Sequence, residues 1–299
     1  MFIAERFRSL VSNDFRILSV TELLMKSHEF VPLQEIVRFS RLREDEVVYR
    51  IRRLSRDRFL AGSPRAPPSY QGYVLTVAGY DALALKALVA SGAVEAVGKS
   101  LGVGKESDIY EALDGLGKRC VIKFHRLGRT SFRQTSRKRG YVAGRSHISW
   151  LYQSRLSAER EYAALRALFA AGVSVPKPLA YSRHAIVMSV IEGTELKFAE
   201  LKDPAPILRE ILRNIRMAYC KVGLVHSDLS EYNILVKANG QLLVIDWPQS
   251  VDVSHPNASD NLRKDISNVI KGFTKKAGLR PDEERVLEYV TGKRRALTL

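Results

Sequence analysis

The sequence predicts an α+β protein in two parts, a small helical N-terminal domain and a larger domain in which strands precede helices. Two observations carry this prediction. Apolar residues recur at helical spacing through most of residues 1–90, and compact apolar runs typical of strands follow between residues 94 and 124. With 299 residues the chain is long enough for one large and one small domain, or for two of similar size.

The first ninety residues have the element order of a winged helix-turn-helix, namely helix, helix, basic helix and β-ribbon. The three helices and the extended ribbon are expected at residues 15–25, after Pro32, at 44–59 and at 72–76. A helix from Ala78 to Ala90 then leads into the second domain. Arginines of the third helix are either nucleic-acid contacts or an exposed basic face. The candidate contacts are Arg50, Arg52 and Arg53.

The second domain is expected to begin with strands and to end with helices. Strands are predicted at residues 94–97, 108–113, 120–124 and 185–188, and helices at 158–171, 206–222, 261–276 and 281–291. Between them, residues 126–147 are rich in Arg, Ser and Gly with little periodicity, which predicts a mobile loop. Ser157 is the expected cap of the helix that follows.

The net charge is +16, and much of the excess lies in one stretch. From Gly115 to Ala158 the chain has no Asp or Glu. The cations of this stretch are Lys118, Arg119, Lys123, Arg126, Arg129, Arg133, Arg137, Lys138, Arg139, Arg145 and Arg155. A basic run of this length favours a polyanionic partner, either nucleotide phosphates or RNA.

The chain is expected to be cytoplasmic, with no membrane association. No apolar run reaches the length of a membrane span, and the N-terminus lacks the pattern of a signal peptide. The two cysteines, Cys120 and Cys220, lie in apolar segments without metal-ligand spacing. We expect buried thiols in a reducing compartment and no disulfide-linked partner. The sequence makes no prediction of oligomeric state.

The segment from His226 to Asn233 (HSDLSEYN) and the Asp246 that follows it carry the chemistry of phosphoryl transfer. That reaction needs a carboxylate to accept the proton of the attacking hydroxyl, and an amide and a second carboxylate to hold Mg²⁺ or Mn²⁺ against the phosphates of ATP. Asp228, Asn233 and Asp246 supply these groups in the order and spacing of a protein-kinase catalytic loop. A solvated loop before an edge strand is the alternative.

A glycine-containing turn and a lysine are the candidate phosphate contacts. Glycines let backbone N–H groups approach phosphate oxygens, although a G-x-G turn alone fits an ordinary hairpin equally well. A lysine at the end of an apolar strand needs an anionic partner. The candidate ATP contacts here are Gly102, Gly104, Lys105, Glu106, Ser107 and Lys123.

Glu161 is the expected partner of that lysine, as in the glutamate–lysine pair of kinases, and Glu159 is its rival. A simple helix-dipole carboxylate is the alternative. The segment after the strand at 185–188 is the expected connection between two lobes. There the backbone of Ser189 and Ile191 would bind the adenine edge, with Met188 behind it.

The combination of GVGKESDIY at Gly102–Tyr110, VIKFHRLGRTSFR around Lys123, HSDLSEYN and IDWPQ resembles the RIO family of atypical protein kinases, in the branch with an N-terminal winged helix. The resemblance implies a winged-helix domain at 1–90 and a truncated two-lobed kinase domain at 91–299. Its N-lobe would cover about 91–188, its hinge 189–193 and its C-lobe about 194–299. Asp228 would be catalytic, and Asn233 and Asp246 would bind metal.

The resemblance also implies activity and partners. Members of this branch phosphorylate themselves on serine and act in maturation of the small ribosomal subunit, so its precursor and RNA are the expected partners. Residues 129–150 would form the family's flexible loop, with Ser131 and Ser136 as candidate autophosphorylation sites. ATPase-like turnover with phosphate carried on Asp246 is a further implication.

The chain departs from ordinary protein kinases at two points. Ser230 replaces the lysine usual after the catalytic aspartate, and no A-P-E motif follows Trp247. We therefore expect autophosphorylation or ATP hydrolysis rather than phosphorylation of a free protein. Two alternatives stay open, an aminoglycoside- or choline-type small-molecule phosphotransferase and a nucleotide-gated RNA-binding module with little kinase output.

Overall fold

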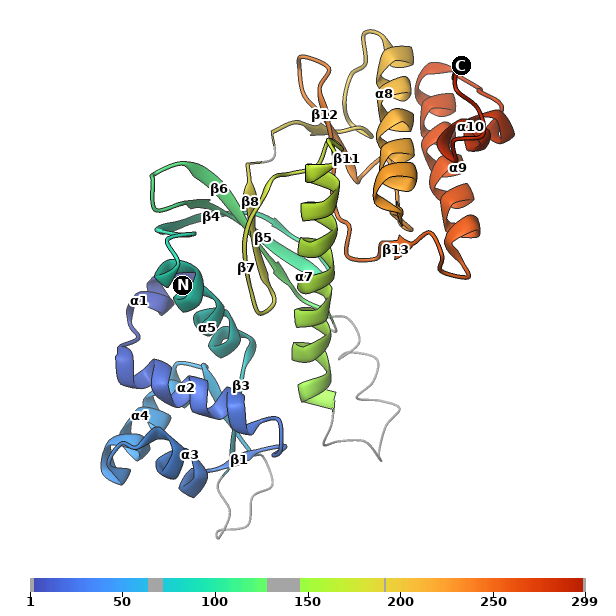
Figure 1. Cartoon of the computed structure of the whole chain (residues 1–299). Coiled ribbons are helices and arrows are strands. Elements are labelled where there is room, and N and C mark those ends of the chain that lie inside the picture. The colour runs from blue at the N-terminus through green and yellow to red at the C-terminus, as the bar shows by residue number, and fades with distance from the viewer. Residues whose placement is uncertain (1–2, 64–71, 128–145, 191, 298–299) are drawn as a thin grey trace. The chain divides into compact units, whose positions relative to one another are not determined.

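The computed structural model describes residues 3–63, 72–127, 146–190 and 192–297 (Figure 1). It divides into two compact units, which we describe in turn. The first unit holds Met1–Ala158 and Ala180–Val187, and the second holds Glu159–Leu179 and Met188–Leu299. In the part of the chain that is described, no helix is both long enough and apolar enough to cross a membrane.

The N-terminal part of the first unit is a winged helix-turn-helix followed by α5. Its elements are α1 (Ile3–Arg8), α2 (Ser12–Leu24), β1 (Val31–Pro32), α3 (Leu33–Ser40), α4 (Glu44–Arg56), β2 (Leu60–Gly62), β3 (Gly72–Leu75) and α5 (Val77–Ala90). The strands form an antiparallel sheet in the order β1-β3-β2. The predicted order of helices and ribbon is confirmed. Strands β1 and β2 were not predicted, because segments of two and three residues are too short to show periodicity.

This domain is held together by apolar residues that its helices and β3 bury in common. The most buried of them are Ile17, Leu18, Ile36, Val47, Ile51, Leu54 and Leu75. In α4 the buried positions Val47, Ile51 and Leu54 recur at intervals of four and three, so one stripe of the helix faces the core. The opposite face is left to charged residues.

A five-stranded sheet completes the first unit. It consists of β4 (Ala96–Val103), β5 (Ser107–Leu113), β6 (Arg119–His125), β7 (Pro178–Ser182) and β8 (Ala185–Ser189), in the order β4-β5-β6-β8-β7. In β6 every residue from Cys120 to His125 is buried, as expected of a strand covered on both faces. The predicted strands at 108–113, 120–124 and 185–188 are confirmed. β4 starts two residues later than predicted and continues to include Gly102, and β7 was not predicted.

The helix after the basic segment, α7 (Ser146–Ala170), begins earlier than predicted. Ser157 is therefore inside the helix rather than its cap, and its Oγ lies 2.9 Å from His125 Nδ1. Trp150 and Leu151 are buried, which explains why this part of the chain is helical despite its weak periodicity. The predicted helix start at Ala158 is thus twelve residues too late, whereas the predicted loop overlaps the helix only at residues 146 and 147. Residues 128–145 lie outside the described residues.

The second unit is mainly helical. It contains β9 (Thr194–Glu195), α8 (Pro204–Met217), the π-helical turn η1 (Ala218–Val222), β10 (Leu224–Val225), β11 (Ile234–Val236), β12 (Leu242–Val244), β13 (Val251–Asp252), α9 (Ala258–Ala277) and α10 (Glu283–Val290). Two small antiparallel sheets form, β12-β11-β9 and β10-β13. Helices α8, α9 and α10 pack side by side (Figure 1). They overlap the helices predicted at 206–222, 261–276 and 281–291.

The two cysteines differ in environment. Cys120 is buried in β6, where burial raises the pKa of its thiol to about 11. Cys220 is exposed, and its Sγ lies 3.3 Å from the carbonyl oxygen of Val290. The prediction of a buried thiol is therefore correct for Cys120 and wrong for Cys220, because its apolar neighbours in sequence turn other faces of the helical segment to the core.

Candidate active site

The loop that carries Asp228 joins β10 to β11, and hydrogen bonds to α9 fix its backbone. Asp265 of α9 accepts two backbone hydrogen bonds, from Ser227 N–H and from Leu229 N–H, both at 2.8 Å. Asn268, one turn further along, donates from Nδ2 to Leu229 O at 3.1 Å. Ser227 has φ of 70°, a conformation that costs about 1 kcal/mol for a residue with a Cβ. The bonds from α9 therefore stabilise a backbone shape that the sequence alone disfavours.

Asp265 was not among the predicted site residues. Its side chain is buried, and burial raises the pKa of this carboxyl above the ordinary aspartate value. One signal was available in the sequence. Leu262, Ile266 and Val269 form the apolar stripe of α9, and Asp265 occupies a position within that stripe. An acid at a core position needs buried hydrogen-bond donors, and here the loop supplies them.

Asp228, Asn233 and Asp246 come together through short-range contacts within the second unit. Asn233 donates from Nδ2 to the carbonyl oxygen of Asp228 at 2.9 Å. The backbone N–H of Ile245 donates to Asn233 O, also at 2.9 Å, which brings the residue before Asp246 beside Asn233. The side chain of Asp228 is exposed and that of Asp246 is half-buried. The three predicted groups thus lie on one loop and one adjoining turn.

The turn that carries Asp246 has a second anchor. Asp246 itself has φ of 68°, and His226 Nε2 lies 3.0 Å from Ile245 O. The His226 ring also packs against Trp247, with ring centroids 4.5 Å apart. Both ends of the turn are therefore fixed to the start of the catalytic loop, which limits how far the Asp246 carboxylate can move relative to Asn233.

The oxygen donors of Asn233 and Asp246 suit a hard divalent cation. Because Nδ2 of Asn233 donates to the backbone, its Oδ1 is the atom that can face a metal ion. Among the described residues no group of three or more His, Cys, Asp or Glu side chains could hold a metal. Mg²⁺ is commonly bound by one or two protein oxygens together with phosphates and water, so the donor set fits Mg²⁺ or Mn²⁺ bound with a nucleotide.

The structure separates Glu161 from its rival. Glu161 is 1% exposed and its Oε1 accepts a hydrogen bond from the backbone N–H of Trp247 at 3.3 Å, whereas Glu159 is exposed. Glu161 is therefore the carboxylate next to the Asp246 turn. Lys123 belongs to the first unit and Glu161 to the second, so their pairing stays a prediction.

The glycine-containing segment forms the hairpin between β4 and β5, with Lys105 and Glu106 at its exposed tip. The N–H of Gly104 donates to Ser107 O at 2.8 Å, and a Cβ on Gly104 would lie 3.3 Å from that oxygen. A Cβ on Gly102 would meet no atom within 4 Å. A side chain at Gly104 would thus crowd the turn slightly, whereas Gly102 leaves its outer face open.

Lys123 lies on β6 directly opposite Ile109 of β5, close to that hairpin in the register of the sheet. Only 5% of its surface is exposed. An ammonium group at such a buried position requires polar or anionic partners. Lys123 lies on β6, the central strand of the five-stranded sheet.

The predicted adenine contacts are only partly placed. The N–H of Ser189 already donates to Lys177 O at 2.9 Å, and its Oγ accepts from Lys177 N–H at 3.0 Å. Ser189 can therefore offer adenine its carbonyl oxygen but not its N–H, so the expected backbone contact of Ser189 is limited to the carbonyl. Met188 is buried. Ile191, Ser131 and Ser136 lie outside the described residues.

The three candidate arginines of α4 differ in their contacts. Arg50 donates to Asp14 Oδ1 at 3.0 Å and to Glu46 at 2.9 Å, and Arg53 donates to the other oxygen of Asp14. Asp14 is completely buried, so both arginines serve the fold of the domain by neutralising it. Arg52 is exposed. Of the three candidates, Arg52 best fits a contact with phosphate.

Together the fold and the loop geometry define a class, a phosphotransferase of the protein-kinase type. Comparison with known proteins specifies it further. A family model described as RIO domain matches residues 108–286, and one described as Rio2, N-terminal matches residues 7–91. The chain therefore belongs to the RIO family of serine/threonine-protein kinases, with the two domains of its Rio2 branch.

Relatives and solved structures agree over nearly the whole chain. The RIO-type serine/threonine-protein kinase Rio2 of Methanocaldococcus jannaschii is 43% identical over 89% of this chain and 100% of its own. Serine/threonine-protein kinase rio2 of Schizosaccharomyces pombe is 40% identical over 90% of this chain and 77% of its own. A crystal structure of the Rio2 kinase–ADP/Mg²⁺–phosphoaspartate complex from Chaetomium thermophilum has a TM-score of 0.84 and 35% identity, covering 96% of this chain and 89% of that one.

Proposed function

We propose that this chain uses ATP with Mg²⁺ or Mn²⁺ to phosphorylate itself on serine or threonine, or to hydrolyse ATP, during maturation of the small ribosomal subunit. The observation that carries the catalytic part is the loop geometry. Asp228 stands exposed on a loop whose backbone is fixed by Asp265, with Asn233 bonded to it and the Asp246 turn bonded to Asn233. The ADP and Mg²⁺ in the Chaetomium structure support the nucleotide and the metal.

In the kinase reaction Asp228 accepts the proton of the attacking hydroxyl. The hydroxyl oxygen forms a bond to the γ-phosphorus while the bond to the β–γ bridging oxygen breaks, and ADP leaves. Asn233 and Asp246 would hold the metal, which when bound would neutralise charge on the phosphates. Lys123 and the hairpin at 102–107 orient the phosphates, and Glu161 supports Lys123. Met188 and the Ser189 carbonyl receive the adenine.

A second route ends in ATP hydrolysis. An Asp246 carboxylate oxygen bonds to the γ-phosphorus as ADP leaves, and water then attacks the acyl phosphate, restoring the carboxylate and releasing phosphate. The phosphoaspartate in the Chaetomium complex favours this route. The chain itself adds a reason, since residues 248–257 alone separate Trp247 from α9. A segment of this length leaves little room for a peptide-docking activation loop.

The partner we propose is a precursor of the small ribosomal subunit, with its RNA contacted by the basic winged helix. The net charge of +16 and the exposed Arg52 support a polyanionic partner. In a nucleotide-gated variant of this proposal, ATP occupancy sets the binding state and turnover releases the particle. The family match argues against a small-molecule phosphotransferase of the aminoglycoside or choline type.

The test is incubation of the purified protein with γ-labelled ATP, with and without small-subunit precursors. Asp228→Ala should lose transfer while still binding ATP, and Lys123→Ala should also bind ATP more weakly. Label that resists hydroxylamine is on serine or threonine, whereas label released by hydroxylamine is on Asp246. Free phosphate that rises with added particles supports the ATPase output. Asp260→Ala, an exposed acid on α9, is the control. Normal transfer by Asp228→Ala would refute the assignment.

A further inference from the structure

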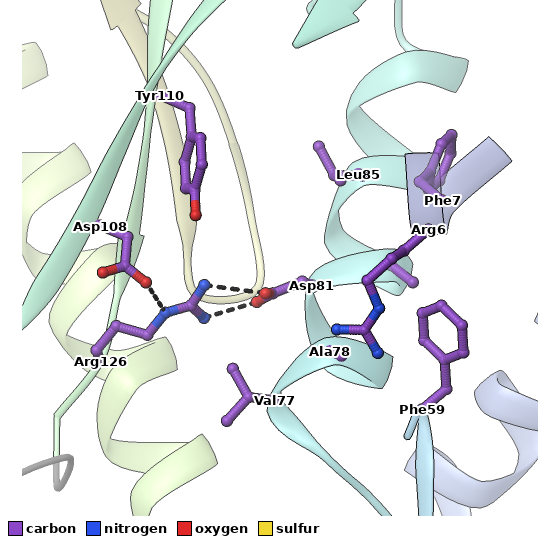
Figure 2. A pocket seen from close by; sticks show the side chains of 11 residues that line it. Arg6, Phe7, Phe59, Val77, Ala78, Asp81, Leu85, Asp108, Tyr110 and Arg126 are labelled. Atoms are coloured by element: carbon purple, nitrogen blue, oxygen red, sulfur yellow. Dashed lines mark hydrogen bonds and ion pairs between the residues drawn. The ribbon is translucent and has the colours of Figure 1, made fainter. Parts of the chain in front are cut away.

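A buried ion network joins α5 of the N-terminal domain to the strands that carry the hairpin at 102–107 (Figure 2). Arg126, the residue after β6, donates from Nε to Asp108 of β5 at 2.8 Å. Its two terminal nitrogens donate to the two carboxylate oxygens of Asp81 in α5, at 2.6 and 2.9 Å. The exposed fractions of the three side chains are 8% or less. All three residues belong to the first unit.

The charges in this network hold each other in place. Burial alone would lower the pKa of Arg126, but the two carboxylates outweigh it and raise that pKa above its ordinary range. Burial would likewise raise the pKa of Asp81, but the charge of Arg126 and the bonds from His184 and Arg126 keep it below the ordinary value. Two parallel hydrogen bonds between a guanidinium and a carboxylate are strongly directional, so the orientation of the guanidinium depends on the position of Asp81.

Packing does not fix Arg126 on every side. A pocket of about 260 Å³ borders the network, between α1 and α5 on one side and β5 and β6 on the other. Its apolar walls include Phe7, Phe59, Leu85 and Tyr110 (Figure 2). Without Asp81 the guanidinium would have space to move toward this pocket. The Phe124 ring, 5.1 Å from the guanidinium carbon, and His184 contact Arg126 as well, but the two carboxylates supply the charged hydrogen bonds that fix its orientation.

The same arginine is bonded to the hairpin through both its backbone and its side chain. Its backbone N–H donates to Glu106 O at 2.6 Å, and its side chain holds Asp108, so it is bonded to the residues on both sides of Ser107. Across the β5–β6 register Ser107 faces His125, and Lys123 lies two residues earlier on the same strand. Movement of Arg126 would thus shift the backbone that we propose faces the phosphates of ATP.

We infer that Arg126 is a positioning residue through which Asp81 of the N-terminal domain sets the phosphate-facing hairpin, so that nucleotide affinity depends on α5. This inference rests on the proposed function, because it assumes that the hairpin binds ATP. It adds a physical connection by which a partner bound to the winged helix can alter ATP affinity. Neither Asp81 nor Arg126 contacts the nucleotide in this account, and both act through the hairpin.

The chain offers a matched control. Arg183, in the turn between β7 and β8, forms a second forked ion pair with Glu22 of α2, at 2.8 and 2.7 Å. This pair also connects the N-terminal domain to the five-stranded sheet, but it lies in the turn at the other edge of the sheet from β4 and β5. Glu22→Gln therefore removes a forked ion pair of similar geometry, but more exposed, at 22% and 23%, without touching the hairpin.

The experiment compares the wild type, Asp81→Asn, Arg126→Lys and Glu22→Gln in the full chain, below the melting temperature of each. Calorimetry measures ADP binding with Mg²⁺, and hydrogen exchange follows the amides of residues 102–107 without nucleotide. For Asp81→Asn and Arg126→Lys we expect the Kd for ADP and the KM for ATP to rise about five-fold or more, with kcat at saturating ATP within about two-fold. Exchange in the hairpin should become faster. Glu22→Gln should match the wild type in all these measurements.

The outcomes are separable. If Asp81→Asn and Arg126→Lys bind ADP as the wild type does, the inference is overturned. It is also overturned if Glu22→Gln weakens binding as strongly, because general loosening of the N-terminal domain would then explain the result. If Asp81→Asn fails to fold, Arg126→Lys is compared with the wild type instead. This substitution keeps the positive charge but cannot form the paired hydrogen bonds of a guanidinium. Failure of the wild type to bind ADP would instead overturn the proposed function.

Discussion

Replacing Asp265 by alanine should loosen the catalytic loop and reduce phosphoryl transfer. The substitution removes a charged acceptor from Ser227 N–H and Leu229 N–H, each bonded at 2.8 Å. A hydrogen bond to a charged group contributes about 1.5–3 kcal/mol. The buried carboxylate itself carries a desolvation cost, seen in its raised pKa, and water can reach the half-buried Ser227. We therefore expect a net loss of about 2–4 kcal/mol in the free energy of unfolding.

The catalytic effect follows from the strained backbone. Without the bonds from α9, Ser227 can leave its φ of 70°, and the adjacent Asp228 carboxylate moves with it. A displacement of about 1 Å of a catalytic group can lower the rate about 100-fold, so a fall in kcat of about 10- to 100-fold is expected. Urea unfolding and label transfer from ATP measure the two effects. Asp260→Ala on the same helix should change neither. A folded Asp265→Ala protein with kcat close to that of the wild type would refute the reasoning.

Acidification should destabilise the first unit through His184, because burial holds its pKa below the 6.5 of an unfolded histidine. As the pH falls below that value, the unfolded chain binds a proton that the folded state excludes. The free energy of unfolding, measured with urea, should fall by up to about 1.4 kcal/mol for each pH unit below 6.5. In His184→Gln this dependence on pH should be weaker, and an equal pH dependence would contradict the prediction. Arg52→Ala should weaken RNA binding and its salt dependence, whereas Arg53→Ala should mainly lower stability because Arg53 neutralises the buried Asp14. Similar effects of both on the salt slope would contradict this distinction. Gly193→Ala should cost about 1–3 kcal/mol in urea unfolding, since φ is 141° and the new Cβ would lie 3.0 Å from Val236 O; unaltered stability would contradict this.

The active-site loop could be predicted from the sequence because its geometry is local. The bond from Asn233 to Asp228 spans five residues, and the hairpin of β11 and β12 returns Asp246 to the same place. The order of the three groups along the chain was therefore enough to place them together. The same holds for the hairpin at 102–107, where two neighbouring strands and a glycine define the turn.

The sequence could not show which of two similar side chains belongs to the site, or which distant residue a side chain contacts. Glu159 and Glu161 have the same chemistry and similar positions in the sequence, and only the packing of α7 shows that Glu161 is buried beside Trp247. Arg50 and Arg53 looked like a surface cluster, because their partner Asp14 lies 36 and 39 residues away. The spacing of residues in α4 gives no indication that Asp14 is their partner.

Apolar spacing and short-range motifs thus predicted most of the helices, the strands β3, β5, β6 and β8, and the phosphotransferase chemistry that the family match supports. The roles of Asp228, Asn233 and Asp246 within that chemistry stay predictions. These features depend on hydrogen bonds and turns between near neighbours, which leave a direct trace in residue order. The support from Asp265, 38 residues from Ser227, and the joining of Asp81 to Arg126, 45 residues apart, emerged from the folded chain alone. Burial makes such pairs strong and directional, but which charges meet depends on how distant elements pack.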